Sequence, residues 1–189
     1  MPVACTRTVA TDERGPACLG ADAGIEHALG RWWVLQTHAR NEKVVAGALA
    51  RQGVAHYLPL VRRPRVYGGR RLTVELPLFP GYVFLCGDAG ACDAAWQTRR
   101  VSKILRVHDQ QGLRTELRQV QRLVESDETA ELYPALVAGR RCRVVSGSLR
   151  GIEGVVIRRR RASRLYVAVT ILGQSAVVEI DGSLLEAID

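Results

Sequence analysis

The chain has 189 residues, a formal net charge of +8 and an apolar fraction of 47%, values typical of one globular domain or two small ones. No apolar run approaches the roughly 18 residues of a membrane span, and the charged residues at positions 12–14 argue against a signal peptide. Five unevenly spaced cysteines without a C-x-x-C pair argue against a disulfide framework or a zinc site and suit the reducing cytoplasm.

The first half of the chain alternates strand and helix signals. Residues 1–28 are rich in Ala, Gly, Thr and Asp without a period, so we expect a disordered leader. The apolar run at 31–36 predicts a strand, and a helix capped by Asn41 and ended by Gly53 is expected to follow. The other predicted elements are a basic hairpin at 62–74 turning at Gly68-Gly69, a strand with an interrupted entry at 76–85, a short helix at 94–99, a strand at 104–107 and a helix opening at Thr115.

The second half carries strand signals alone. Periodicity fades before it, and Pro134 interrupts the chain, which predicts a linker. Short strands at 142–145, 155–157, 165–172 and 176–180 then predict a small closed β-barrel. Gly147, Gly151 and Gly154 stand where strands must turn back, and glycine permits positive φ there.

Residue patterns for catalysis are missing from the sequence. The four histidines show neither H-E-x-x-H spacing nor a nucleophile-elbow context. Gly68-Gly69 lacks the lysine and the serine or threonine with which a P-loop holds phosphates. We therefore expect no catalytic residues, no metal site and no cofactor.

Motifs in both halves resemble the NusG family of transcription elongation factors. The first half contains Trp32-Trp33-Val34-Leu35-Gln36-Thr37 and Leu78-Phe79-Pro80-Gly81-Tyr82-Val83-Phe84. In the second half, the glycine pattern at 147–154 resembles a KOW motif, and the segment 169–180 resembles the end of the family's C-terminal domain.

The resemblance covers residues 31–189 in the family's order and implies an α+β fold. We expect an N-terminal antiparallel sheet flanked by helices, followed by a C-terminal SH3-like KOW β-barrel. The expected boundaries are a leader at 1–28, a NusG-like N-terminal domain at 29–126, a linker at 127–138 and a KOW domain at 139–189.

In the family, an apolar face of the first domain binds the clamp helices of the largest subunit of RNA polymerase. The resemblance assigns this contact to Val34, Gln36, Phe79, Pro80, Tyr82 and Phe84. Strand alternation puts Pro80, Tyr82 and Phe84 on one face, which predicts an exposed aromatic patch. The alternative is that this face belongs to the core of the domain itself.

Basic residues are expected near nucleic acid. The resemblance places Arg40, Lys43, Arg51, Arg99 and Arg100 on segments that approach the non-template DNA strand of the transcription bubble. Such cations contact phosphates without reading the sequence, and a solvated charged surface is the alternative for each. The arm at 62–71 is expected to meet nucleic acid or polymerase, and Arg158–Arg161 with Arg164 is expected to meet RNA or the ribosome.

The loop formed by Leu172, Gly173 and Gln174 corresponds to the family's contact with the termination factor Rho or a ribosomal small-subunit protein. NusG itself usually carries an aromatic residue where Leu172 stands, so this loop favours an RfaH-like or polysaccharide-operon antiterminator. We therefore expect a cytoplasmic factor that binds polymerase, suppresses pausing and promotes antitermination. The alternatives are a KOW-containing ribosomal or RNA-binding protein without polymerase binding, and an unrecognised hydrolase.

Overall fold

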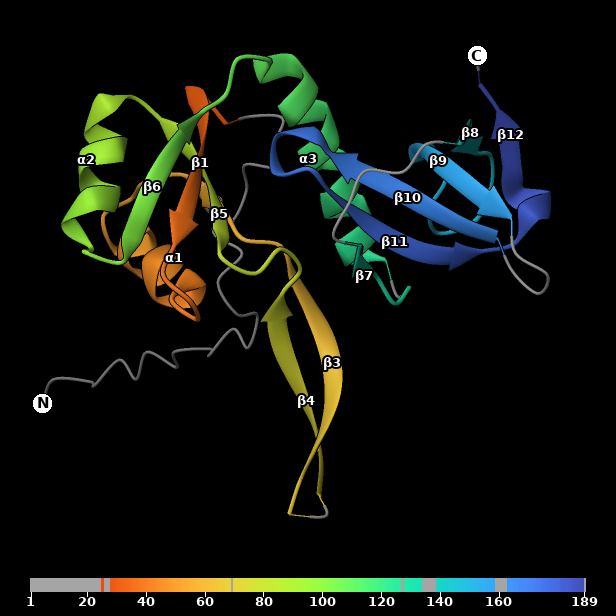
Figure 1. The fold of residues 1–189 in the computed structure, drawn as a ribbon, viewed down its shortest axis with the longest axis horizontal. Helices are drawn as coiled ribbons and strands as arrows, with labels where there is room; N and C mark the ends of the chain where they lie inside the picture. The colour runs from red at the N-terminus through yellow and green to blue at the C-terminus, as the bar shows by residue number, and fades with distance from the viewer. Residues whose placement is uncertain are drawn as a thin grey trace, which may run out of the picture.

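The computed structural model describes Ile25 and residues 28–68, 70–126, 128–133, 139–158 and 163–188. Figure 1 shows two β-sheet modules on either side of one long helix, with a two-stranded hairpin projecting from the first module. The arrangement confirms the predicted α+β fold class: an N-terminal antiparallel sheet flanked by helices, followed by a β-sheet module.

The first sheet has the strand order β2-β5-β1-β6, with every neighbouring pair antiparallel. Its strands are β1 (Arg31–Thr37), β2 (His56–Tyr57), β5 (Tyr82–Gly87) and β6 (Val101–Arg106). One face, with Leu35 and Leu85, forms a core with α1 (Glu42–Arg51) and α2 (Ala89–Gln97). The other, with Trp32, Val34 and Phe84, shares a core with α3 (Gln110–Glu125). Helices therefore cover both faces of this sheet.

The predicted basic hairpin is present. Strands β3 (Leu60–Tyr67) and β4 (Arg70–Pro77) pair along their whole length, and Gly68 in the turn has a φ of 54°. Figure 1 shows the pair extending away from both sheets. Val66 and Leu72 are accordingly exposed, because nothing in the described chain covers the outer part of the hairpin.

The second sheet has the order β12-β8-β9-β10-β11-β7. Its strands are β7 (Glu131–Tyr133), β8 (Arg140–Val144), β9 (Glu153–Arg158), β10 (Ser163–Val169), β11 (Gln174–Ile180) and β12 (Leu185–Ala187), with short 3-10 turns at Thr170–Leu172 and Gly182–Leu184. The ladder ends at β12 and β7 in the described chain, and this six-stranded sheet is consistent with the predicted KOW-type module. The range expected to be a linker contributes β7, which pairs with β11; Pro134 lies outside the described residues.

Two helices begin earlier than the apolar period predicts. Helix α2 starts at Ala89 because the carboxylate of Asp88 accepts the backbone N–H of Ala91 at 3.1 Å. Helix α3 starts at Gln110 because the carboxylate of Asp109 accepts the N–H of Gly112 at 2.7 Å. Aspartate caps satisfy free N–H groups in the first turn, so each helix begins before its apolar face does.

Asn41 is the N-cap residue of α1, as predicted, but its side chain makes no capping hydrogen bond. The Asn41 side-chain amide instead donates to the carbonyls of His38 and Ala39.

Within the expected leader, Ile25 and Ala28 are described and buried in the core that contains α3; the rest of the leader lies outside the described residues. In the described part of the chain, no helix has the length and apolar character that crossing a membrane requires.

Candidate functional site

Four of the six residues expected to bind polymerase lie together on one face of the first sheet. Val34 pairs with Phe84, and Gln36 pairs with Tyr82, across the antiparallel strands β1 and β5. Paired residues in adjacent antiparallel strands point to the same side. Phe79 and Pro80 lie just before β5, in the turn that leads into it.

Half of the six residues expected to bind polymerase are buried, and the predicted exposed patch of Pro80, Tyr82 and Phe84 is wrong for Phe84. Phe84, Phe79 and Val34 are all buried. The ring of Phe84 lies 6.4 Å, centroid to centroid, from the rings of both Tyr57 and Phe79. These aromatic residues share a core with α3, so the fold covers this end of the face itself.

The other end of the face is open. Gln36 and Pro80 are exposed, and Tyr82 is half-buried against the core. We call these three residues the open end of the face. Of these three residues, tyrosine belongs to the types that are enriched at protein interfaces.

The turn before Tyr82 is held by a residue that sequence analysis did not select. The buried carboxylate of Glu42 accepts the backbone N–H of Gly81 at 2.6 Å. The Gly81 carbonyl in turn accepts the N–H of Thr37 at 2.8 Å. Gly81 has a φ of 85°, in the region that favours glycine. Helix α1 and strand β1 therefore fix the position of Pro80 and Tyr82.

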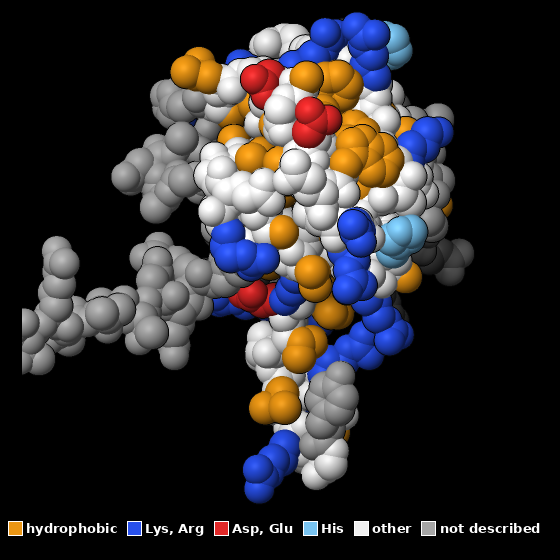
Figure 2. Space-filling view, turned by 90° about the vertical axis from the view of Figure 1, so that its left-hand side faces the viewer, with side chains coloured by type: hydrophobic (Ala, Val, Ile, Leu, Met, Phe, Trp, Pro, Cys, Tyr) orange, Lys and Arg blue, Asp and Glu red, His pale blue; other side chains and the backbone are white. Residues whose placement is uncertain are grey.

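Four of the five expected nucleic-acid-proximal cations gather at one corner of the first module. Arg40 and Lys43 precede and begin α1, while Arg99 and Arg100 follow α2, and all four are exposed. The segments are joined because His38 donates its N–H to the carbonyl of Arg100 at 2.9 Å. Figure 2, which faces the side that carries α2, shows Lys and Arg side chains gathered between an apolar area and the hairpin.

Arg51 does not belong to this group. It is exposed in the last turn of α1, eight positions after Lys43, which corresponds to about 12 Å along the helix. Of the second basic cluster, the Arg158 side chain and residues 159–161 lie outside the described part of the chain. Arg164 pairs with Glu179 at 3.0 Å across β10 and β11.

The predicted partner loop of the second module lies against α3. Glu116 of α3 accepts hydrogen bonds from the backbone N–H of Thr170, at 3.0 Å, and from its hydroxyl. Leu172, two residues on, is partly buried against the shared core, Gly173 has a φ of 63°, and Gln174 begins β11. Sequence analysis missed Glu116, because a lone glutamate on a helix carries no signal for a partner 54 positions away.

The three glycines of the KOW-like pattern serve two different purposes. Gly147 and Gly151 both have a φ of 85°, as the sequence predicts. Gly154 does not have a positive φ, so the prediction that a positive φ requires glycine is wrong at this position. A Cβ atom on Gly154 would lie 2.4 Å from the carbonyl oxygen of Tyr166, so β9 and β10 approach too closely there for a side chain.

The structure is thus a helix-flanked antiparallel sheet with a cationic corner, followed by a second β-sheet module. The family model described as "Transcription termination factor nusG" matches residues 30–128. The chain belongs to the NusG family.

One similar solved structure comes from Thermotoga maritima and is entitled "Domain interaction in Thermotoga maritima NusG". It shares 20% sequence identity with this chain, with a TM-score of 0.45, over 84% of this chain and 97% of that one. A search of curated proteins gives no match.

Proposed function

We propose that this NusG-family protein binds RNA polymerase through the open end of the face, and that it promotes processive elongation without catalysing a reaction. The observation that carries the proposal is the half-buried Tyr82 beside exposed Pro80 and Gln36. Glu42 holds the turn between them, so the surface is ordered before a partner arrives. Preorganisation of this kind lowers the entropic cost of binding. The expected partner is the pair of clamp helices in the largest polymerase subunit.

The proposed mechanism is preferential binding to one state of the polymerase. A ligand shifts a conformational equilibrium only by its difference in affinity for the two states. A preference of about 1.4 kcal/mol for the closed clamp over the paused state changes their ratio about tenfold. A few contacts at Tyr82 and Pro80 are enough for such a preference, and the expected result is suppressed pausing and antitermination in the cytoplasm.

The cationic corner supports a second contact, with non-template DNA in the transcription bubble. Arg40, Lys43, Arg99 and Arg100 come from two segments that a backbone hydrogen bond joins. Their charges suit phosphates, whose recognition needs no base-specific geometry.

The second module is proposed to recruit another factor through Leu172, Gly173 and Gln174, either a ribosomal small-subunit protein or Rho. Thr170, next to this loop, donates two hydrogen bonds to Glu116, which hold the start of the loop against α3. Leu172 in place of an aromatic residue supports a specialised antiterminator rather than a general NusG.

A pausing assay on purified elongation complexes tests this function. The wild-type protein is expected to shorten the lifetime of a defined pause, and Tyr82→Ala is expected to lose most of that effect. Val145→Ala is the matched control, because Val145 is an exposed apolar residue in the second module. Equal pause lifetimes with the wild type and with no added protein would rule out the proposed activity.

A further inference from the structure

Strand β7 and the residue before it have contacts with both modules. The strand pairs with β11 of the second sheet, beginning with Glu131 opposite Val177. Arg63 of the hairpin strand β3 donates to the carbonyl of Ala130 at 2.6 Å and lies 3.6 Å from a carboxylate oxygen of Glu131. Figure 1 shows β7 between the base of the hairpin and β11. The start of β7 is therefore held by the first module as well as by the second sheet.

The outer edge of β11 is longer than β7. Strand β11 pairs with β10 along its whole length, whereas β7 covers only residues 175–177 of it. Within the described chain, residues 178–180 therefore have no strand on this outer edge. A cavity of about 400 Å³ lies beside them, with Thr129 and Glu179 among the residues that line it. The free part of the edge thus has room for more backbone.

The two residues before β7 match this free edge in register. If the pairing of β7 is continued, Ala130 lies opposite Val178 and Thr129 lies opposite Glu179. Strand alternation puts Ala130 on the same face as Leu132, which packs against the core, and puts Thr129 on the exposed face. Threonine is also enriched in strands. Both residues therefore suit a longer β7.

Arg63 holds these residues away from β11. Ala130 is buried, and its carbonyl is bound by the guanidinium of the first module, so the backbone leaves the line of β7 at this point. Glu128 would come next on the core side, where an unpaired carboxylate is costly to bury, so an extension of β7 ends at Thr129. The side chain of Thr129 is exposed, which leaves it free to move.

We propose that residues 129–130 are a strap with two alternative positions. While Arg63 holds the strap, β7 has three residues and the outer edge of β11 is open. When Arg63 releases the strap, β7 grows by these two residues and covers Val178 and Glu179. An unpaired strand edge can pair with other chains, so the closed strap protects the second sheet once it is no longer held to the hairpin. This inference goes beyond the proposed function and does not depend on polymerase binding.

Nuclear magnetic resonance of the full chain tests the proposal with two readouts. Cross-strand proton contacts between Thr129 and Glu179, and between Ala130 and Val178, report the closed strap. Residues directly opposite in antiparallel strands have Cα atoms about 4.5–5.5 Å apart, close enough for such contacts. Amide hydrogen exchange at residues 178–180 reports whether the outer edge has gained a partner. Contacts between β10 and β11 serve as the check that each variant is folded.

The variants separate the anchor from the general charge of the hairpin. Arg63→Ala removes the anchor, and Arg62→Ala is the matched control. Arg62 is the neighbouring cation on the same strand, and it lies 3.7 Å from Glu75 within the hairpin. Arg63→Lys keeps the charge but loses the fork of donors that reaches both Ala130 and Glu131.

Arg63→Ala is expected to show both cross-strand contacts. It should also slow exchange about tenfold at the amides of residues 178–180 that face the strap. Arg63→Lys should show the same contacts with lower intensity. The wild type and Arg62→Ala should show neither contact, and the contacts between β10 and β11 should be the same in all four proteins.

Missing strap contacts in a folded Arg63→Ala protein would overturn the proposal. So would the same contacts in the wild type or in Arg62→Ala, because the strap would then close without losing its anchor. Unchanged or faster exchange at residues 178–180 in Arg63→Ala would show that the edge gains no partner. The affinity for polymerase plays no part in these readouts, so either proposal can fail while the other stands.

Discussion

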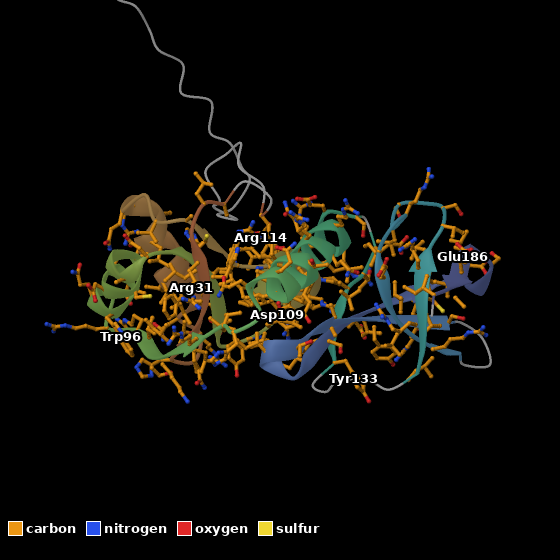
Figure 3. All side chains as sticks on the ribbon, turned by 90° about the horizontal axis from the view of Figure 1, so that it is seen from above. Arg31, Trp96, Asp109, Arg114, Tyr133 and Glu186 are labelled. Atoms are coloured by element: carbon orange, nitrogen blue, oxygen red, sulfur yellow. The ribbon has the colours of Figure 1, made fainter. Side chains whose placement is uncertain are left out.

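Glu116 in α3 accepts two hydrogen bonds from Thr170 in the second module, one from its backbone N–H at 3.0 Å and one from its hydroxyl. Nearby, Gln119 of α3 accepts the N–H of Glu153 at 2.7 Å. The buried residues of the same helix share a core with the first sheet. Helix α3 is therefore a structural part of both modules, and Figure 3 shows it between them, with Asp109 and Arg114 labelled.

Glu116→Ala is expected to loosen the second module from α3. The change removes the acceptor for two hydrogen bonds at a partly buried position, which costs about 1 kcal/mol below pH 4.5. Amide hydrogen exchange should rise at Thr170 and Leu172 and stay unchanged in β1 and β5. Unchanged exchange at Thr170 would show that Glu116 does not hold this loop.

The same contact should depend on pH. Burial, the largest cause, raises the pKa of Glu116 above 4.5, despite the opposing hydrogen bonds from Thr170. Because the pKa of Glu116 is raised in the folded state, the contribution of Glu116 to the stability of the protein is fully present below pH 4.5. That contribution is lost as the pH rises through the raised pKa.

Glu116→Gln is neutral at every pH and keeps an acceptor for Thr170. Its stability relative to the wild type should therefore increase as the pH rises from 4.5, as measured by urea unfolding. Because other titrating groups contribute equally to both proteins, the difference isolates Glu116. A difference that stays constant across this range would contradict the raised pKa.

Glu42→Ala is expected to destabilise the chain by about 2 kcal/mol, because it removes a buried charged acceptor from the Gly81 N–H. Urea unfolding measures this change, with Glu186→Ala as the control, since Glu186 is exposed on β12. The Gly81 amide should also exchange faster. Equal stability of the two variants would mean that Glu42 does not hold the turn before Tyr82.

Gly81→Ala and Gly154→Ala should each destabilise the folded protein, by different amounts and for different reasons. A Cβ on Gly81 meets nothing within 4 Å, so the cost is only that of a positive φ, about 1–2 kcal/mol. A Cβ on Gly154 meets the Tyr166 backbone oxygen at 2.4 Å, so strands must separate, at a cost of about 3 kcal/mol or more. Thermal unfolding distinguishes them, and a smaller loss for Gly154→Ala would contradict the close approach.

The sequence predicts the strands of the first sheet because their apolar runs are dense and local. It also predicts that Tyr82 and Phe84 share a face, which follows from alternation alone. It does not reveal that Phe84 is buried, because the covering core includes α3, which begins at Gln110, well beyond the strand. Local periodicity assigns a side chain to a face but carries no information on what packs there.

Tertiary contacts explain the other differences between the structure and what the sequence predicts. Glu42 is close to its partner Gly81 only after α1 and β5 are placed side by side. Strand β7 has three residues and no alternation long enough to recognise, so its pairing with β11 decides its conformation. The resemblance names the four residues of the cationic corner together with Arg51, which lies apart from them. The hydrogen bond between His38 and Arg100 that joins the two segments is a tertiary contact, which no local pattern reveals.

The equilibrium affinity of the full chain for purified core RNA polymerase tests the central claim most directly. The comparison is between wild type, Tyr82→Ala and Val145→Ala, with unfolding curves to show that each variant is folded. Loss of an interface anchor costs about 2 kcal/mol, so Tyr82→Ala should bind about 30-fold more weakly, and Val145→Ala should match the wild type. Equal affinities for all three proteins would contradict docking through the open end of the face.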